Sequence, residues 1–117
     1  MILFYSRLST ITSKGATMNV RFDFLILNLL KKEEMYGFQI IKKIEDISQG
    51  ECEIKTGTLY PLLQTLVANG YISVSYLPVH GRNRNVYRIT ESGLKYLSEQ
   101  TERWIKYMTI VQKIIDL

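Results

Sequence analysis

The stretch KTGTLYPLLQTL, residues 55–66, predicts one helix with two different faces. Its leucines, together with Val67, recur at the spacing of a helix that buries one side in a core. The opposite face lies downstream of Lys55 and carries hydroxyl and amide groups, which can reach base edges and phosphate oxygens of DNA. An ordinary amphipathic helix is the alternative interpretation. The residues that we expect to form a DNA-binding face are Lys55, Thr56, Thr58, Tyr60 and Gln64.

A β-hairpin is expected directly after this helix. Residues 68–70, Ala-Asn-Gly, have the composition of a helix end, because Asn and Gly tolerate a left-handed backbone. Residues 71–77 then alternate apolar and polar side chains, as in a half-buried strand. Residues 78–84 are expected to break the strand and residues 86–89 to resume it. This arrangement places Arg82 and Arg84 at the hairpin tip.

Two shorter helices are expected before residue 55. The first ends near Lys31 and Lys32, and its apolar residues are Phe22, Leu25, Ile26 and Leu29. The second ends at Gly50, and the residues that mark its buried side are Gly37, Ile40, Ile44 and Ile47. Three helices followed by a basic-tipped hairpin are typical of a winged helix-turn-helix, in which the third helix enters the major groove.

The start of the third helix follows from local rules. Thr56 has the side chain of an N-cap residue. Pro61 is expected near the first turn, because a proline inside a helix clashes with the carbonyl four residues earlier. That earlier residue is Gly57, which adjusts most easily.

A long helix is expected at the C-terminus, with Thr90 as its cap and Glu91 favouring its dipole. Apolar residues along it alternate spacings of three and four over about three heptads, which is typical of a coiled-coil seam. We expect the same helix of a second subunit to cover this seam. Packing on its own domain is the alternative. The residues assigned to the dimer interface are Leu97, Trp104, Met108, Val111 and Ile115.

Three motifs together resemble the ordered signature of PadR-like transcriptional regulators. They are MYGFQII at 35–41, GTLYP at 57–61 and RNVYRITESG at 84–93, and GTLYP is the specific one. The resemblance extends from about Phe22 to the C-terminus. The chain departs from the family pattern at Asn85 and Val86, where Lys and Tyr are common, and at Tyr76, where Trp is frequent. The departure at Asn85 weakens one phosphate contact of the wing.

The resemblance also implies a repressor and an effector site. In small members of the family with a single C-terminal helix, which include the multidrug-sensing ones, tryptophans of two subunits flank a pore that admits flat aromatic compounds. Trp104 resembles that tryptophan, and stacking on indole adds about 0.5 to 1.5 kcal/mol beyond burial. An ordinary interface tryptophan is the alternative. The candidate effector residues are Trp104, Tyr107 and Met108.

The net charge favours an anionic partner only mildly. It is +4 for the 117 residues, with a pI of about 9.2. Arg7 and Lys14 precede Met18, so the rest of the chain carries a net charge of only +2. DNA binding must therefore depend on where the cations lie. The cations that we expect to contact the DNA backbone are Lys42, Lys43, Arg82, Arg84 and Arg88.

Enzymes and membrane proteins find little support in the sequence. His80, the single histidine, lies in an expected loop, and no carboxylate pair, metal-ligand cluster or phosphate-binding glycine loop is present. We therefore expect no catalysis, no metal and no cofactor. Cys52 lies between two glutamates that disfavour its thiolate, and a chain with one cysteine fits a reducing cytoplasm. The longest apolar run, residues 22–30, is too short to span a bilayer.

The expected fold is mainly α with a small β-hairpin: a winged helix-turn-helix at 18–90 and a dimerisation helix at 91–117. Residues 1–17 are expected to be a disordered arm or an artefact of the start codon, with translation beginning at Met18. The expected function is a homodimeric, DNA-binding transcriptional regulator with a palindromic operator. A winged domain that binds another regulator and not DNA is the alternative.

Overall fold

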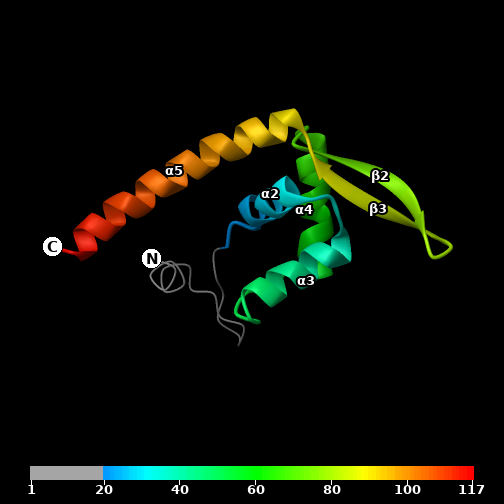
Figure 1. The fold of residues 1–117 in the computed structure, drawn as a ribbon, viewed down its shortest axis with the longest axis horizontal. Helices are drawn as coiled ribbons and strands as arrows, with labels where there is room; N and C mark the ends of the chain where they lie inside the picture. The colour runs from blue at the N-terminus through cyan, green and yellow to red at the C-terminus, as the bar shows by residue number, and fades with distance from the viewer. Residues whose placement is uncertain (1–19) are drawn as a thin grey trace.

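The structure, a computed structural model, describes residues 20–117 as four helices and a three-stranded antiparallel sheet (Figure 1). This is the mainly helical winged fold that the sequence predicts. The arm expected at residues 1–17 lies outside the described residues. In chain order the elements are α2 (Phe22–Lys32), β1 (Met35–Tyr36), α3 (Gly37–Ile47), α4 (Thr56–Ala68), β2 (Ile72–Val79), β3 (Arg82–Ile89) and α5 (Glu91–Ile115).

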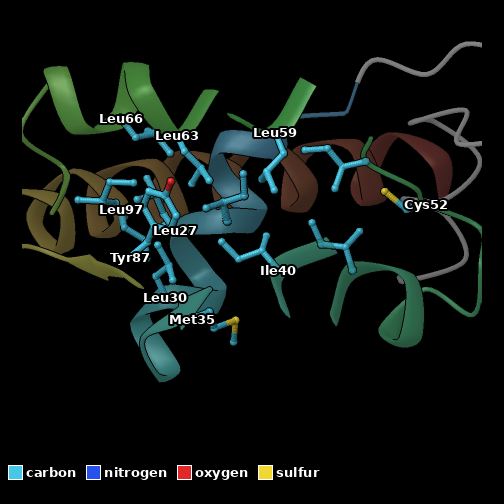
Figure 2. Packing of buried hydrophobic residues seen from close by; sticks show 14 residues of the cluster. Leu27, Leu30, Met35, Ile40, Cys52, Leu59, Leu63, Leu66, Tyr87 and Leu97 are labelled. Carbon is cyan, nitrogen blue, oxygen red and sulfur yellow. The ribbon is translucent and has the colours of Figure 1, made fainter. Parts of the chain in front are cut away.

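The core lies between α2, α3 and α4 and is closed by the base of the sheet and the start of α5 (Figure 2). The predicted apolar stripe of α4 is confirmed, because Leu59, Leu63 and Leu66 are buried and its other members pack against the same core. Helix α2 buries Ile26, Leu27 and Leu30 most deeply. Its residues Phe22, Leu25 and Leu29 are only half-buried, so the predicted stripe of α2 is rotated towards one side.

Helix α3 ends as predicted, but its last apolar residue is not in the core. Ile47 is 70% exposed, because it lies in the final turn, beyond the elements that cover Ile40 and Ile44. Gly50 follows with a positive φ of +80°, as expected of a residue that ends a helix.

Helix α4 begins one residue earlier than expected. Lys55, not Thr56, is the N-cap, because its backbone is extended and its carbonyl accepts the amides of Thr58 and Leu59. Pro61 consequently lies inside the helix, beyond the first turn. The position four residues earlier is Gly57, which has open space around it, so the start of the helix can accommodate the proline ring.

The hairpin is longer and its turn is tighter than predicted. Residues 78–84 do not break the strand, since Pro78 pairs with Asn83 and Val79 with Arg82. His80 and Gly81 form the turn with φ of +50° and +77°, the signs that a two-residue hairpin turn requires. Because β2 is an edge strand in the order β1-β3-β2, it can hold a proline.

The buried side chains of the hairpin, among those that the structure describes, are Ile72, Val86 and Tyr87, in the half nearer the helices. Ile72 is buried, whereas Val74 and Tyr76 are exposed, the latter by 70%. Residues 71–77 therefore form a strand as predicted, but its apolar side chains are not all buried, because the hairpin extends beyond the helices that cover its base (Figure 1).

Helix α5 runs past α2, and its C-terminal part extends away from the helical body (Figure 1). Thr90 caps it as predicted, since the Thr90 hydroxyl oxygen accepts the amide of Gly93 at 3.0 Å. Among the helices of residues 20–117, none combines the length and apolar composition needed for a membrane span.

Candidate nucleic-acid interface

The predicted polar face of α4 is open to solvent. Lys55, Thr56, Thr58, Tyr60 and Gln64 are all exposed. Thr65 is exposed on the same helix and was missed by the sequence reasoning. Its hydroxyl donates to the carbonyl of Pro61 at 3.1 Å, so this group is partly engaged within the helix. The face is thus available for contact, and its binding to DNA stays a prediction.

Tyr60 lies over the start of α3. A Cβ atom added at Gly37 would lie 2.6 Å from the hydroxyl oxygen of Tyr60 and 2.9 Å from its ring. Only a glycine therefore leaves room for the tyrosine in this position. The side chain of Tyr60 is consequently directed from α4 towards α3 and the wing, a relationship that local sequence patterns do not reveal.

Two aromatic rings beside Tyr60 support an arginine of the wing. The rings of Tyr36 and Phe38 stack with centroids 5.7 Å apart and planes 20° apart. The guanidinium carbon of Arg84 lies 5.1 Å from the Phe38 ring centroid, within the range of a cation–π interaction. Arg84 thus lies two residues behind Arg82, against the body of the protein rather than at the tip.

The other cationic side chains that were predicted to contact the DNA backbone differ in their partners within the protein. Arg88 donates from Nε and Nη2 to Oε2 of Glu34, at 3.2 and 2.5 Å, so a carboxylate of the chain compensates its charge. Lys42 forms a long, exposed ion pair with Asp46 at 3.9 Å. Within residues 20–117, neither Arg82 nor Lys43 has a carboxylate partner. Exposed ion pairs such as Arg88–Glu34 and Lys42–Asp46 contribute little to the stability of the fold.

A surface hollow of about 310 Å³ joins α4, the predicted recognition helix, to the wing, which is the hairpin of β2 and β3. It lies between the start of α3, Tyr60 of α4 and the strands of the hairpin. Phe38 is exposed, and it lies off the apolar stripe of α3. A large aromatic residue at such a position is a signal in the sequence for a binding surface, but it was not among the predicted site residues. The residues that line the hollow are Tyr36, Gly37, Phe38, Tyr60, Tyr76, Arg84, Asn85 and Tyr87.

The remaining reactive group is buried away from this surface. Cys52 belongs to the hydrophobic core, and burial raises the pKa of its thiol. A raised pKa lowers the thiolate fraction, so this cysteine is a poor nucleophile. The described residues contain no group of three or more His, Cys, Asp or Glu side chains that could hold a metal ion.

The predicted seam of α5 is divided between the chain's own interior and its surface. Leu97 is part of the core, and Trp104 is half-buried and stacks on Phe24 of α2, with ring centroids 6.5 Å apart. Met108 is buried outside that core cluster, Val111 is half-buried and Ile115 is exposed. These residues therefore do not form one continuous exposed seam.

A second set of apolar residues, in the C-terminal half of α5, is exposed. Ile115 also belongs to the predicted seam, but the others were not assigned to the interface, because the predicted seam follows a single stripe and this half of α5 has apolar residues on more than one side. The exposed set is Ile105, Tyr107, Ile110, Ile114 and Ile115.

Comparisons with known proteins show which family this chain is similar to. The model of the transcriptional regulator PadR-like family matches residues 26–99. An uncharacterized protein of Lysinibacillus sphaericus is 36% identical over 96 residues, which are 81% of this chain and 84% of that protein. The transcriptional regulator YqjI of Escherichia coli is 29% identical over 79 residues, or 68% of this chain, which spans only 37% of that protein. The solved structure of a transcriptional regulator from Clostridium thermocellum is similar with a TM-score of 0.71 and 35% identity, covering 78% of this chain and 89% of that chain.

Proposed function

Because the chain belongs to the PadR-like family of transcriptional regulators, we propose that it is a repressor that binds a palindromic operator as a homodimer. The family consists of transcriptional regulators, which confirms the expectation that the chain is not an enzyme. The observation that carries the proposal is the shared hollow: Tyr60 of α4 and Arg84 of the wing line the same surface. The recognition helix and the wing thus present one continuous face to a duplex. We also propose a cytoplasmic location.

In this proposal α4 enters the major groove and the wing lies along the adjacent backbone. The exposed hydroxyl and amide groups of Thr58 and Gln64 contact base edges. Arg82 and Lys43, which have no carboxylate partner among the described residues, supply sequence-independent attraction to phosphates.

The homodimer is supported by the exposed apolar side chains of α5. Tyr107, Ile110 and Ile114 recur at spacings of three and four along a helix that extends away from the body, so they lie on one side of it. Contiguous exposed apolar surfaces on a small protein usually mark an interface. A two-fold arrangement of winged heads would place two α4 helices in successive major grooves, which explains a palindromic operator.

The proposed effector is a flat aromatic compound that binds near Trp104 between two subunits. Trp104 already stacks on Phe24, and Tyr107 is exposed one turn away. A second aromatic surface supplied by a partner helix would complete a stacking site. Met108 is buried, so in this proposal it lines the site from below and does not stack on the compound.

A protein-interaction module remains the second candidate. The observation that favours it is the ion pairing of Arg88 with Glu34 and of Lys42 with Asp46, which reduces the positive charge offered to DNA. Asn85, which replaces a common lysine of the wing, points the same way.

A salt-dependent gel shift with the DNA upstream of the protein's own gene separates these functions. We expect tight binding that weakens linearly with salt on logarithmic axes, together with weaker binding to a random duplex of equal length. Equal and weak affinity for both duplexes at physiological salt would contradict an operator-binding repressor and favour the interaction module.

A further inference from the structure

We propose that the hollow between α3, α4 and the wing seats one phosphodiester group of the DNA backbone, with the Arg84 guanidinium and the Tyr60 hydroxyl as its donors. The inference rests on the proposed function and assigns a site within it. It also changes the role of Tyr60 from reading a base to holding the backbone.

The charge of the hollow suits a phosphate. Among the described residues that line it, Arg84 is the only charged one, because the others are aromatic residues, a glycine and an asparagine. Within residues 20–117, no carboxylate pairs with Arg84, in contrast to Arg88 with its Glu34 partner. The guanidinium rests on Phe38, at 5.1 Å from the ring centroid. An arginine whose plane is held by a ring is prepared for the two-pronged contact that phosphate oxygens accept.

The Tyr60 hydroxyl is a second donor in the hollow. The close approach of Tyr60 to Gly37 shows that its ring lies over the start of α3. No hydrogen bond between residues of the described segment occupies its hydroxyl group. A phenol that is 40% exposed and directed into a surface hollow can donate to an incoming anion.

The position and size of the hollow favour the DNA backbone over a free anion. When α4 lies in the major groove and the wing on the adjacent backbone, the strand between them must pass over the junction of these two elements. The hollow lies at this junction, and its volume of about 310 Å³ leaves space for a sugar beside the phosphate. The exposed rings of Phe38 and Tyr76 offer apolar surfaces to the deoxyribose.

The experiment replaces single phosphodiesters of the bound upstream DNA by neutral methylphosphonates, one position at a time through a half-site. We expect one position at which the neutral linkage weakens wild-type binding by about tenfold or more, as for one lost charge-assisted contact. At that position Arg84→Ala should bind the modified and unmodified DNA almost equally, because the charged contact is already lost. Tyr60→Phe keeps Arg84 but loses the second donor, so its sensitivity to the neutral linkage should be smaller than that of the wild type. Arg103→Ala, which removes an exposed arginine of α5, is the matched control and should keep the full wild-type sensitivity.

Each other outcome has a distinct meaning. Neutral linkages that weaken the variants as much as the wild type at every position would overturn the inference and leave DNA binding intact. Thermal stabilisation of the wild type, but not of Arg84→Ala, by inorganic phosphate at constant ionic strength would assign the hollow to a free phosphate if no linkage shows coupling. A wild-type protein that does not bind its upstream DNA would overturn the proposed function itself. Thermal unfolding of Tyr60→Phe at the wild-type temperature establishes that its fold is intact.

Discussion

Gly93, in the first turn of α5, lies directly against the backbone carbonyl of Tyr71, so that an added Cβ atom would overlap this oxygen. The same carbonyl accepts the amide of Thr90 at 3.0 Å, and the Thr90 hydroxyl donates to the carbonyl of Gly70 at 2.6 Å. The Tyr71 amide in turn donates to Leu66 of α4 at 3.0 Å. The end of the recognition helix is therefore joined directly to the start of the long C-terminal helix, and the two helices have a fixed relative orientation.

Gly93→Ala should destabilise the fold, because the atoms that the new methyl group meets belong to the backbone and cannot rotate away. We expect a loss of about 1 to 3 kcal/mol in the free energy of unfolding, as for other overpacked positions. Gly57→Ala is the control, since a Cβ there meets nothing within 4 Å and the residue is helical. It should be neutral or stabilising by about 0.5 to 1 kcal/mol. Urea unfolding of both variants measures the difference, and equal stabilities would show that the α4–α5 junction is not tightly packed.

The sequence predicted the elements well because each has a local signal. The period of the leucines fixes the buried side of α4, and Thr90 marks the start of α5. The one-residue shift at Lys55 arose because Thr56 has a capping side chain that the structure does not use. The periodicity of apolar residues shows the side of the element on which a side chain lies, but not whether another element buries it. It therefore failed at Ile47 and Tyr76, which point as expected but extend beyond the elements that cover their neighbours.

The hollow was beyond prediction for a different reason. Its walls come from residues that are far apart in the sequence, such as Tyr36, Tyr60 and Arg84. Each is recognisable alone as an aromatic or a cation near an expected DNA-binding element. Only the packing of α4 against α3, with Gly37 leaving room for the Tyr60 ring, brings them together.

Gly37→Ala tests this packing. The atoms nearest the new methyl group belong to the far end of Tyr60, which can rotate, so we expect a loss of at most about 1 kcal/mol of stability. The displaced Tyr60 hydroxyl should weaken binding to operator and random DNA by a similar factor, because it contacts the backbone in the proposed arrangement. Fluorescence anisotropy with both duplexes measures the two affinities. Unchanged affinity for both would separate the position of Tyr60 from DNA binding.

Gln64→Ala should reduce the discrimination between operator and random DNA by about 1 to 3 kcal/mol, because an amide on the exposed face of α4 is suited to a base edge. Its unfolding free energy should stay close to that of the wild type. Leu63→Ala, one residue away on the buried side, should instead cost about 2 to 5 kcal/mol of stability. Calorimetry and competition binding distinguish the two effects, and unaltered discrimination in Gln64→Ala would show that another side of α4 faces the bases.

Arg82→Ala should lower the slope of log affinity against log salt by about one, for specific and random DNA alike, because Arg82 has an exposed side chain and contacts phosphate in the proposal. Arg88→Ala is the matched comparison, and its effect should be smaller because Glu34 already compensates the charge of Arg88. Binding titrations at four or more salt concentrations provide the slopes. A larger change for Arg88 than for Arg82 would show that DNA binding breaks the pair with Glu34.

The exposed apolar side of α5 should hold the dimer together. Ile110 and Ile114 lie one helical turn apart and are 52% and 62% exposed, so a charge at either position leaves the fold of one chain intact. Against an apolar partner helix the same charge would be buried without a counterion, which is costly. Ile110→Glu and Ile114→Glu should therefore yield folded monomers that bind operator DNA weakly, because one winged head reaches only one half-site. Lys95→Gln, at an exposed position about four turns away on the same helix, controls for a change in charge of one unit. Sedimentation at micromolar concentration measures the assembly, and a wild-type protein that sediments as a monomer would remove both the dimer and the two-subunit effector site at Trp104.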